Sequence, residues 1–230
     1  YTIEGTEPEY FKETRTLDFG QVTDYRYSAT DILLKVLSYP DIARKQWVFR
    51  QYDHQVQTNT VEGPGSDAAI LRLKGTDKAI AVTNDGNGRF CYLDPYVGGS
   101  IAVAEACRNL SAVGAEPIAI TDCLNFGNPE RPDVYFQLEQ CIKGIAEACK
   151  VFNIPVVSGN VSLYNETRGT AIWPTPVIGG LGILENANHR ANIKFQDDND
   201  VVIMLGSSNI STEISGLSGS AYLEVVHNKV

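Results

Sequence analysis

Apolar residues between residues 20 and 50 recur with the period of a helix. The polar stretch Ser28–Asp31 has the composition of a helix start, and four apolar residues follow it on one face: Ile32, Leu33, Val36 and Leu37. The pattern predicts one helix here and a short second one that covers Ile42–Phe49. Residues 1–20 are polar with scattered aromatic residues and no sustained period, which predicts an edge strand or a linker.

From residue 55 onward, strand-like and helix-like patterns alternate along the chain. Short apolar or alternating runs predict strands at 55–61, 68–73, 78–83, 117–120, 154–157 and 177–183. Closely spaced small residues from Ile101 predict one helix, which follows a loop at Asp94–Ser100, and a longer amphipathic run predicts a second helix that begins at Asp133. The alternation predicts a fold of the α/β (α+β) class, with helices flanking a sheet.

The composition changes after residue 185. An acidic stretch, Asp197–Asp200, precedes the apolar run Val201–Leu205, which predicts the first strand of a second domain. The last residues, Ala221–His227, also have a strand-like pattern. We therefore expect a lead-in at 1–40, a complete domain at 41–185 and a truncated domain at 186–230. A chain that starts without Met and ends in such a stretch is expected to be part of a longer protein.

The composition is that of an ordinary globular protein, with 230 residues, 43% hydrophobic and 20% charged. A net charge of −9 argues against general affinity for nucleic acid or anionic membranes, although a phosphate neutralised by Mg²⁺ remains compatible with it. No apolar run approaches the roughly 18 residues of a membrane span. Five cysteines without a CxxC pair indicate buried thiols in a reducing compartment, which predicts a cytoplasmic protein.

Polar residues cluster where predicted strands end, at Asp85, Asp94, Asp122–Asn125 and Gly159–Ser162. Carboxylate and amide oxygens beside glycine are what Mg²⁺ and phosphate groups require, because the metal prefers hard oxygen ligands and phosphate needs accessible backbone N–H groups. We expect the stretch Ser158–Glu166 to form a tight turn after a strand. The sequence contains neither a P-loop motif nor a dinucleotide-binding glycine motif at a strand end.

Each of these residues also has a purely structural interpretation. Asp85 in Asn-Asp-Gly is typical of a turn, and Asp94 before a proline is typical of a helix cap. The stretch Ser158–Glu166 is compatible with a simple polar turn. Asp122 has the strongest independent claim to a ligand, because a carboxylate after a buried strand must be paired or metal-bound. His54 has no carboxylate nearby in the sequence and is interpreted as a surface or satisfied histidine.

A series of motifs in unbroken order resembles phosphoribosylformylglycinamidine synthase, the fourth-step enzyme of purine biosynthesis. The resemblance is to the second half of the synthetase subunit of the small bacterial or archaeal type. It is carried by Gln51–Asp53, Pro64–Ala69, Asp94–Pro95, Ala102–Asn109, Gly114–Pro117, Thr121–Glu130, Ser158–Glu166 and Pro174–Gly179.

This resemblance implies a fold of the aminoimidazole ribonucleotide synthetase type, in which strands of two related halves pair into a barrel-like interface. It implies a ligase reaction in which ATP phosphorylates the formamide oxygen of formylglycinamide ribonucleotide and glutamine-derived ammonia displaces the phosphate. ATP and Mg²⁺ are the implied cofactors. The implied partners are the first half of the same synthetase, a glutaminase subunit and a small accessory subunit.

Carried over at matching positions, Asp122 and Gly159 are expected to bind ATP, Asn160 to bind Mg²⁺ and Ser162 to contact the substrate. The catalytic histidine of the family's first half has no counterpart here, because Asp85–Arg89 occupies the equivalent stretch. We therefore expect no catalytic base in this chain. The remaining candidates for site residues are Asp85, Asp94 and Asn125.

Two other functions stay open at this point. The missing histidine is compatible with a noncatalytic half that binds a nucleotide only to hold a duplicated fold together. Another synthetase or kinase of the same superfamily, such as selenophosphate synthetase or thiamine-phosphate kinase, is the second alternative. In either case the isolated chain is expected to lack amidation activity, and to associate through exposed barrel strands.

Overall fold

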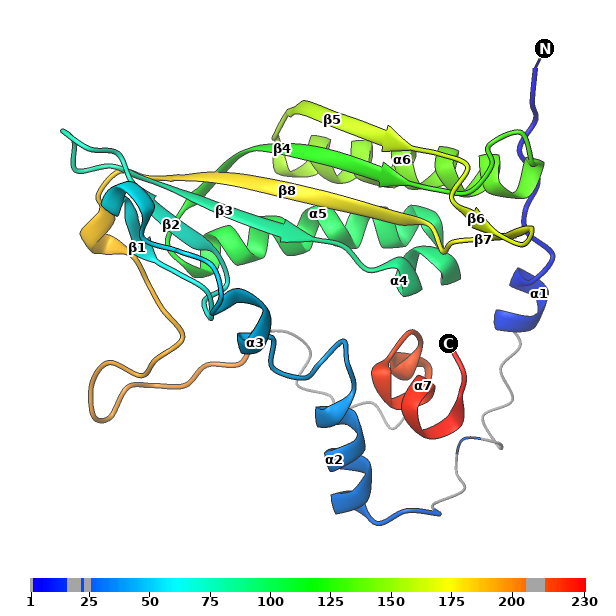
Figure 1. Ribbon diagram of the computed structural model, residues 1–230, viewed down its shortest axis with the longest axis horizontal. Helices are drawn as coiled ribbons and strands as arrows, with labels where there is room; N and C mark the ends of the chain where they lie inside the picture. Colours follow the sequence, from blue (N-terminus) through cyan, green and yellow to red (C-terminus); the bar gives the residue numbers. More distant parts are fainter. Residues whose placement is uncertain (1, 16–21, 23–25, 206–213) are drawn as a thin grey trace. The chain divides into compact units, whose positions relative to one another are not determined.

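The structure, a computed structural model, describes residues 2–15, 22, 26–205 and 214–230 (Figure 1). The chain divides into two compact units. The first joins Tyr1–Phe11 to Gln51–Ile193, and the second joins Lys12–Arg50 to Lys194–Val230. None of the helices within the described ranges is both long and apolar enough to cross a membrane.

A six-stranded sheet in the order β1-β2-β3-β8-β4-β5 forms the centre of the first unit. Its strands are β1 (Thr60–Glu62), β2 (Ala69–Arg72), β3 (Ala79–Asp85), β4 (Glu116–Asn125), β5 (Val156–Ser162) and β8 (Thr175–Leu184). Only β4 and β5 pair in parallel; the other neighbours are antiparallel. A parallel pair needs a long crossover, which the helix α6 (Pro132–Phe152) provides. A separate hairpin pairs β6 (Glu166–Thr167) with β7 (Thr170–Ala171).

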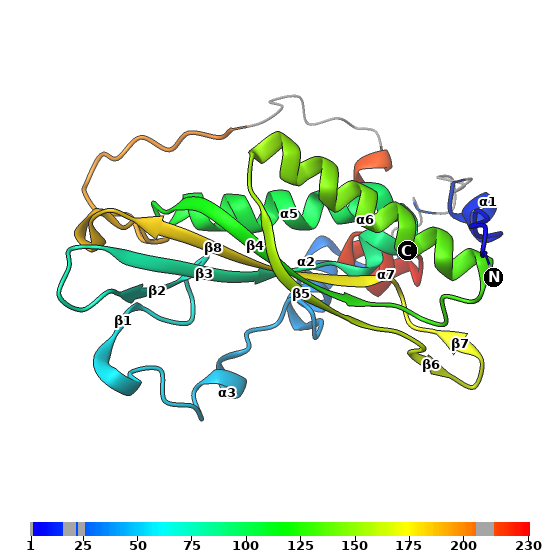
Figure 2. The same cartoon turned by 90° about the horizontal axis from the view of Figure 1, so that it is seen from above.

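Two long helices, α5 (Pro95–Ala112) and α6, cover one face of this sheet (Figure 2). They approach each other closely, because a Cβ on Gly144 of α6 would overlap the carbonyl oxygen of Tyr96 in α5. Apolar side chains from both helices and the sheet form the main core cluster, which includes Val103, Ile120 and Phe126. This mixed arrangement of sheet and helices confirms the predicted α/β class.

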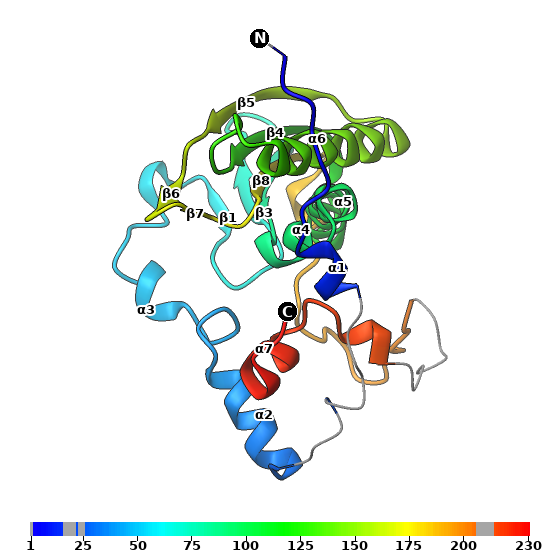
Figure 3. The same cartoon turned by 90° about the vertical axis from the view of Figure 1, so that its right-hand side faces the viewer.

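Side chains on the two faces of the sheet have different surroundings, and β8 shows the difference directly. Its residues alternate between buried and partly buried along the whole strand. A Cβ on Gly180 would meet Leu110 of α5, so this face, the helix face, looks toward the helices. A Cβ on Gly179 would instead meet Thr121 Oγ1 and Asn84 Oδ1 on the opposite face. We call that second side the open face. Among the described residues of this unit, the two long helices lie on the helix face and not on the open face (Figure 3).

The N-terminal segment runs beside α6 (Figure 3). The Thr6 amide donates to the carbonyl oxygen of Pro132, and the Tyr10 ring stacks on Tyr92 with their centroids 4.1 Å apart. Its described residues contain the short helix α1 (Phe11–Thr14) and no strand, so the expected edge strand is absent from them. The segment is instead held by side-chain contacts and single backbone hydrogen bonds.

The second unit contains helices and extended segments. Its helices are α2 (Ala29–Ser38), α3 (Gln46–Phe49), η4 (Ile214–Leu217) and α7 (Ala221–His227). The predicted start of α2 is confirmed, because Ser28 and Asp31 form a reciprocal capping box. The short second helix is also confirmed, although α3 covers only the later part of the expected range Ile42–Phe49.

Two predictions near the C-terminus were wrong. Val201–Leu205 is described without strand structure, because no described segment pairs with it and an isolated strand leaves its backbone groups unpaired. Ala221–His227 forms the helix α7 rather than a strand. Ser220 caps its first turn by accepting from the Leu223 amide, and Asn228 ends it in the left-handed conformation.

Two further differences lie before β4. The strand expected at 55–61 is reduced to β1, because Gln57 and Thr58 adopt positive φ within the short helix η2 (Val56–Thr58) and interrupt the extended backbone. A helix that the pattern did not predict, α4 (Gly88–Leu93), follows β3. Its start is set by Asn87, whose side chain accepts from the Arg89 and Phe90 amides.

Candidate functional site

The parallel pairing of β4 with β5 brings most of the predicted site residues together. Asp122 lies directly beside Gly159, and Asn125 lies beside Ser162. Asn160 pairs with Cys123 between them. The tight turn expected from Ser158 onward was wrong, since β5 continues to Ser162 for as long as β4 offers it hydrogen-bond partners. Residues 163–165 follow β5 and lead into β6 at Glu166.

The alternation of side chains along these strands divides the predicted residues between the two faces of the sheet. Asp122 lies between Ile120 and Leu124 in alternate positions, and both belong to the core beneath the helices, so Asp122 and its neighbour Gly159 belong to the helix face. Asn125, Asn160 and Ser162 belong to the open face. Because β5 is an edge strand with exposed residues on both faces, a ligand can reach both groups around that edge.

The Asp122 carboxylate occupies the space that a side chain at position 159 would need. A Cβ on Gly159 would overlap Asp122 Oδ1 and lie 2.8 Å from Asp122 Cγ. Burial raises the pKa of Asp122, against the opposing effect of a hydrogen bond from its own backbone. No described side chain donates a hydrogen bond to this carboxylate. A partly buried carboxylate without a side-chain partner is suited to receive donor groups from a ligand.

On the open face, Asn160 is exposed and Asn125 is committed to the sheet. Asn125 Nδ2 donates to the carbonyl oxygens of Thr175, at 3.0 Å, and Cys123, at 3.1 Å. Asn160 offers an amide oxygen of the kind that Mg²⁺ accepts. No group of three or more His, Cys, Asp or Glu side chains gathers at one point in the described part of the chain. Asn160 therefore fits one position of a metal site completed by other ligands, and this chain alone does not fit a complete one.

Asp85 and Asp94 lie apart from this pair of strands and have structural partners. Asp94 Oδ1 accepts from the Val97 amide at 3.0 Å, which confirms the helix-cap interpretation. Asp85 is not a turn residue: it is buried at the end of β3 and accepts from Thr83 Oγ1 at 3.0 Å and from Asn109 Nδ2 at 2.7 Å. Burial raises the pKa of Asp85 even though both hydrogen bonds lower it.

The raised pKa of Asp85 leads to a testable pH dependence. Below its unfolded pKa of about 3.9, the carboxyl is protonated in both states and costs nothing. As the pH rises, the unfolded state loses its proton first, so the contribution of Asp85 to the free energy of unfolding falls until the pH passes the folded pKa. We expect Asp85→Asn to flatten this dependence and to raise the free energy of unfolding near neutral pH.

Urea unfolding at a series of pH values measures this effect. Asp94→Asn is the matched control, because asparagine also caps helices and Asp85 remains in place. A steep fall in stability with pH that survives Asp85→Asn, or a large loss of stability at neutral pH, contradicts the interpretation.

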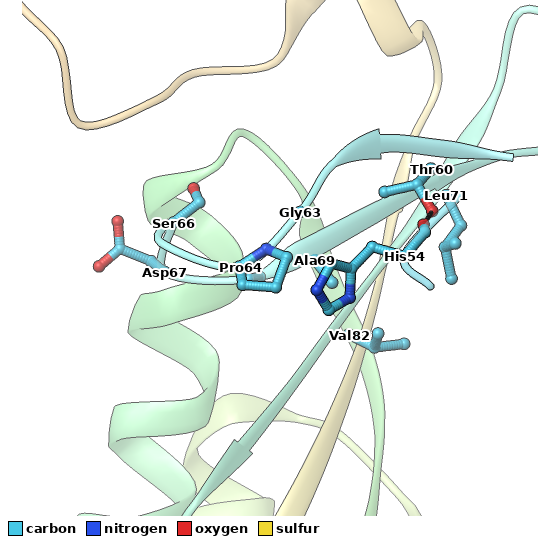
Figure 4. A pocket seen from close by; sticks show the side chains of 10 residues that line it. His54, Thr60, Gly63, Pro64, Ser66, Asp67, Ala69, Leu71 and Val82 are labelled. Atoms are coloured by element: carbon cyan, nitrogen blue, oxygen red, sulfur yellow. Dashed lines mark hydrogen bonds between the residues drawn. The ribbon is translucent and has the colours of Figure 1, made fainter. Parts of the chain in front are cut away.

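Two cavities lie near the β3 side of the sheet. One of about 480 Å³ lies over the strands and includes Asn84, Thr121 and Gly179 of the open face. Another of about 280 Å³ lies beside the loop between β1 and β2, where the rings of His54 and Pro64 lie side by side while Ser66 and Asp67 point away (Figure 4). No predicted site residue lines the second cavity.

Residues 65–184 match the family described as AIR synthase related protein, N-terminal domain. The whole chain is 50% identical to phosphoribosylformylglycinamidine synthase subunit PurL of Caldanaerobacter subterraneus subsp. tengcongensis and to that of Moorella thermoacetica. It spans 31% of the length of each of these relatives.

Solved structures are similar over 66% of the chain and 25% of the matched protein. PurLQS from Thermotoga maritima is 40% identical with a TM-score of 0.62. PurL of T. maritima complexed with ATP and the same protein complexed with FGAR are 39% and 40% identical, each with a TM-score of 0.59. These similarities confirm the family resemblance that the motifs predicted, together with its type of fold.

Proposed function

Because the chain belongs to the AIR synthase related proteins through their N-terminal domain, we propose that it forms part of a phosphoribosylformylglycinamidine synthase. The proposed reaction is the ATP-dependent conversion of formylglycinamide ribonucleotide and glutamine-derived ammonia to formylglycinamidine ribonucleotide, ADP and phosphate. The observation that supports it most is the adjacent pair Asp122 and Gly159, where the carboxylate without a side-chain donor lies over a glycine that leaves it room. The ATP complex of the T. maritima relative supports nucleotide as the ligand class.

In this proposal the helix face of β5 binds ATP, and the open face binds the ribonucleotide and the Mg²⁺ that accompanies ATP. Asp122 and Gly159 hold ATP, and Ser162 contacts the ribonucleotide. Asn160 would supply one oxygen to a bound Mg²⁺, and the ion would supply positive charge to neutralise the phosphates of ATP. The residues from Asp85 to Arg89 include no histidine. In this proposal the catalytic base for the attack by ammonia therefore comes from another part of the synthetase.

The exposed edge of the sheet supports a partner. Val157 and Val161 on β5 are 61% and 59% exposed, and the edge leaves backbone groups of β5 available for pairing. We assign this side of the unit to the first half of the same synthetase. A glutaminase subunit and a small accessory subunit complete the proposed assembly, and its proposed location is the cytoplasm, where the five free cysteines remain reduced.

The proposal also assigns a domain to each part of the sequence. Residues 41–185 are the synthetase-like N-terminal domain, and 186–230 begin its C-terminal domain. Residues 1–40 connect them to the preceding half. Limited proteolysis of the complete synthetase measures these boundaries.

Isothermal titration of the complete synthetase with Mg·ATP and with the ribonucleotide tests the function. We expect the double variant Asn160→Ala, Ser162→Ala to lose about fivefold in affinity for each ligand, because each ligand loses one hydrogen bond or metal contact of roughly 1 kcal/mol. Asn186→Ala, which removes an amide that caps the short helix η3 (Ala187–His189), is the matched control.

The opposite result supports the other function. If the double variant binds nucleotide and ribonucleotide with unchanged affinity, the shared-site role is wrong. This result favours a noncatalytic half that binds nucleotide to stabilise the duplicated fold. The absence of histidine from Asp85–Arg89 is the observation that keeps this second function in view.

A further inference from the structure

The segment that follows β5 is closed around the side chain of Asn165. Asn165 Nδ2 donates to the carbonyl oxygen of Ser162 at 2.8 Å and to that of Phe126 at 3.0 Å. The backbone supports the same closure, because the Phe126 amide donates to Ser162 O and the Asn165 amide donates to Phe126 O. One amide side chain therefore ties the end of β4 to the end of β5.

The backbone of this segment is under conformational constraint. Tyr164 adopts a φ of 60°, in the left-handed region that residues other than glycine seldom enter. Its amide donates to the carbonyl oxygen of Gly127 at 2.9 Å, and its side chain is exposed. This conformation is held in place by the hydrogen bond between the Tyr164 amide and Gly127, together with the hydrogen bonds that the neighbouring Asn165 makes.

The chemistry of the two carbonyl partners determines the orientation of the Asn165 amide. Carbonyl oxygens accept only, so the NH₂ group must face Ser162 O and Phe126 O, and both of its protons are used there. The amide oxygen then faces the hydroxyl of Ser162, which donates to Asn165 Oδ1 at 3.3 Å. Asn165 Nδ2 also lies 3.1 Å from Ser162 Oγ, but its two shorter contacts already occupy its protons.

This arrangement sets how Ser162 meets a ligand. When the hydroxyl donates to Asn165 Oδ1, the remaining lone pair of Ser162 Oγ is left for a donor group of the ligand, such as a hydroxyl or an amide N–H. Rotation of the hydroxyl away from Asn165 would leave the amide oxygen without this partner. The carboxamide of Asn165 is thus the group that fixes both the position and the polarity of Ser162.

We propose that Asn165 is a positioning residue for ribonucleotide binding, which acts through Ser162 by fixing the orientation of its hydroxyl. This inference rests on the proposed function, because it uses the role of Ser162 as a substrate contact. It adds a residue that contacts no ligand itself. The amide hydrogen bonds of Asn165 give it a structural role as well, so the test must separate the two roles.

A double-mutant cycle in the complete synthetase separates them. Steady-state kinetics are measured for Asn165→Ala, for Ser162→Ala and for the double variant, with the KM for the ribonucleotide and the KM for ATP determined separately. Each single substitution is expected to raise the KM for the ribonucleotide about fivefold, which corresponds to one neutral hydrogen bond. The double variant is expected to exceed Ser162→Ala by less than about twofold, and the KM for ATP should remain unchanged.

Two controls accompany the cycle. Asn186→Ala removes a capping amide elsewhere in the first unit and is expected to leave both KM values unchanged. If Asn165→Ala does not fold, Asn165→Ser replaces it, because serine keeps a polar group at this position yet is too short to reach both carbonyl oxygens. Thermal unfolding of every variant shows which substitutions preserve the fold.

The outcomes distinguish the inference from the proposed function. If the effects of Asn165→Ala and Ser162→Ala on the KM for the ribonucleotide multiply in the double variant, the positioning role alone is overturned. The same holds if Asn165→Ala raises the KM for ATP as much as the KM for the ribonucleotide. A Ser162→Ala variant with an unchanged KM for the ribonucleotide overturns the proposed contact and the positioning role together.

Discussion

Replacement of Gly159 by alanine is expected to lower the affinity of the synthetase for ATP by at least about 100-fold, the loss that a displacement of about 1 Å can cause in a preorganised site. The added methyl group would overlap the Asp122 carboxylate and lie 2.6 Å from the Asp122 carbonyl oxygen. The carbonyl oxygen cannot move freely, because the backbone of Asp122 pairs with Gly159 on one side and with Ile178 of β8 on the other. The carboxylate must therefore leave its position.

Equilibrium binding of Mg·ATP measures this loss, and thermal unfolding shows whether the variant still folds. Gly63→Ala is the matched control, because the nearest heavy atom to a Cβ there, Thr60 Cγ2, is 3.9 Å away. We expect the control to bind ATP like the unmodified protein. A folded Gly159→Ala variant with undiminished ATP affinity would show that the space over Gly159 has no part in nucleotide binding.

Much of the fold follows from local patterns in the sequence. The alternating apolar runs predicted most of the strands of the central sheet, amphipathic spacing predicted α2 and α6, and closely spaced small residues predicted α5. These elements are specified by periodic burial, which is visible in one dimension. The elements that were missed or mistaken are short ones set by single capping residues, such as Asn87 before α4 and Ser220 before α7.

The candidate site was predictable in its residues and not in its geometry. Asp122, Gly159, Asn160 and Ser162 were expected together, and the parallel register of β4 and β5 places them on adjacent strands. Their division between two faces could not be predicted, because it depends on where β5 ends and which strand it pairs with. A turn from Ser158 onward would have no alternation of side chains, whereas the extended β5 directs successive side chains to opposite faces.

Asn165 shows a second limit of sequence reasoning. It belongs to the stretch that carries the family resemblance, yet its partners include Phe126, which is 39 residues away. A contact between two strand ends becomes visible only once the strands are paired. The local sequence could indicate a turn residue at this position, since asparagine is common in turns, but not the serine hydroxyl that it orients.

The central claim is that ATP is held from the helix face by Asp122 and the ribonucleotide from the open face by Ser162. Steady-state kinetics of Asp122→Asn and Ser162→Ala in the complete synthetase test it most directly. Asp122→Asn replaces an ionised acceptor by a neutral amide of the same shape, and hydrogen bonds to charged groups contribute about 1.5–3 kcal/mol. We expect the KM for ATP to rise roughly 10- to 100-fold, with the KM for the ribonucleotide nearly unchanged.

Ser162→Ala should do the reverse, raising the KM for the ribonucleotide about fivefold and leaving the KM for ATP unchanged. Asn186→Ala serves again as the control, since the side chain of Asn186 caps η3. This crossed pattern of KM values is the result that the account predicts. A result in which both substitutions alter the same KM, or in which neither alters any, contradicts the assignment of the two ligands to the two faces of the sheet.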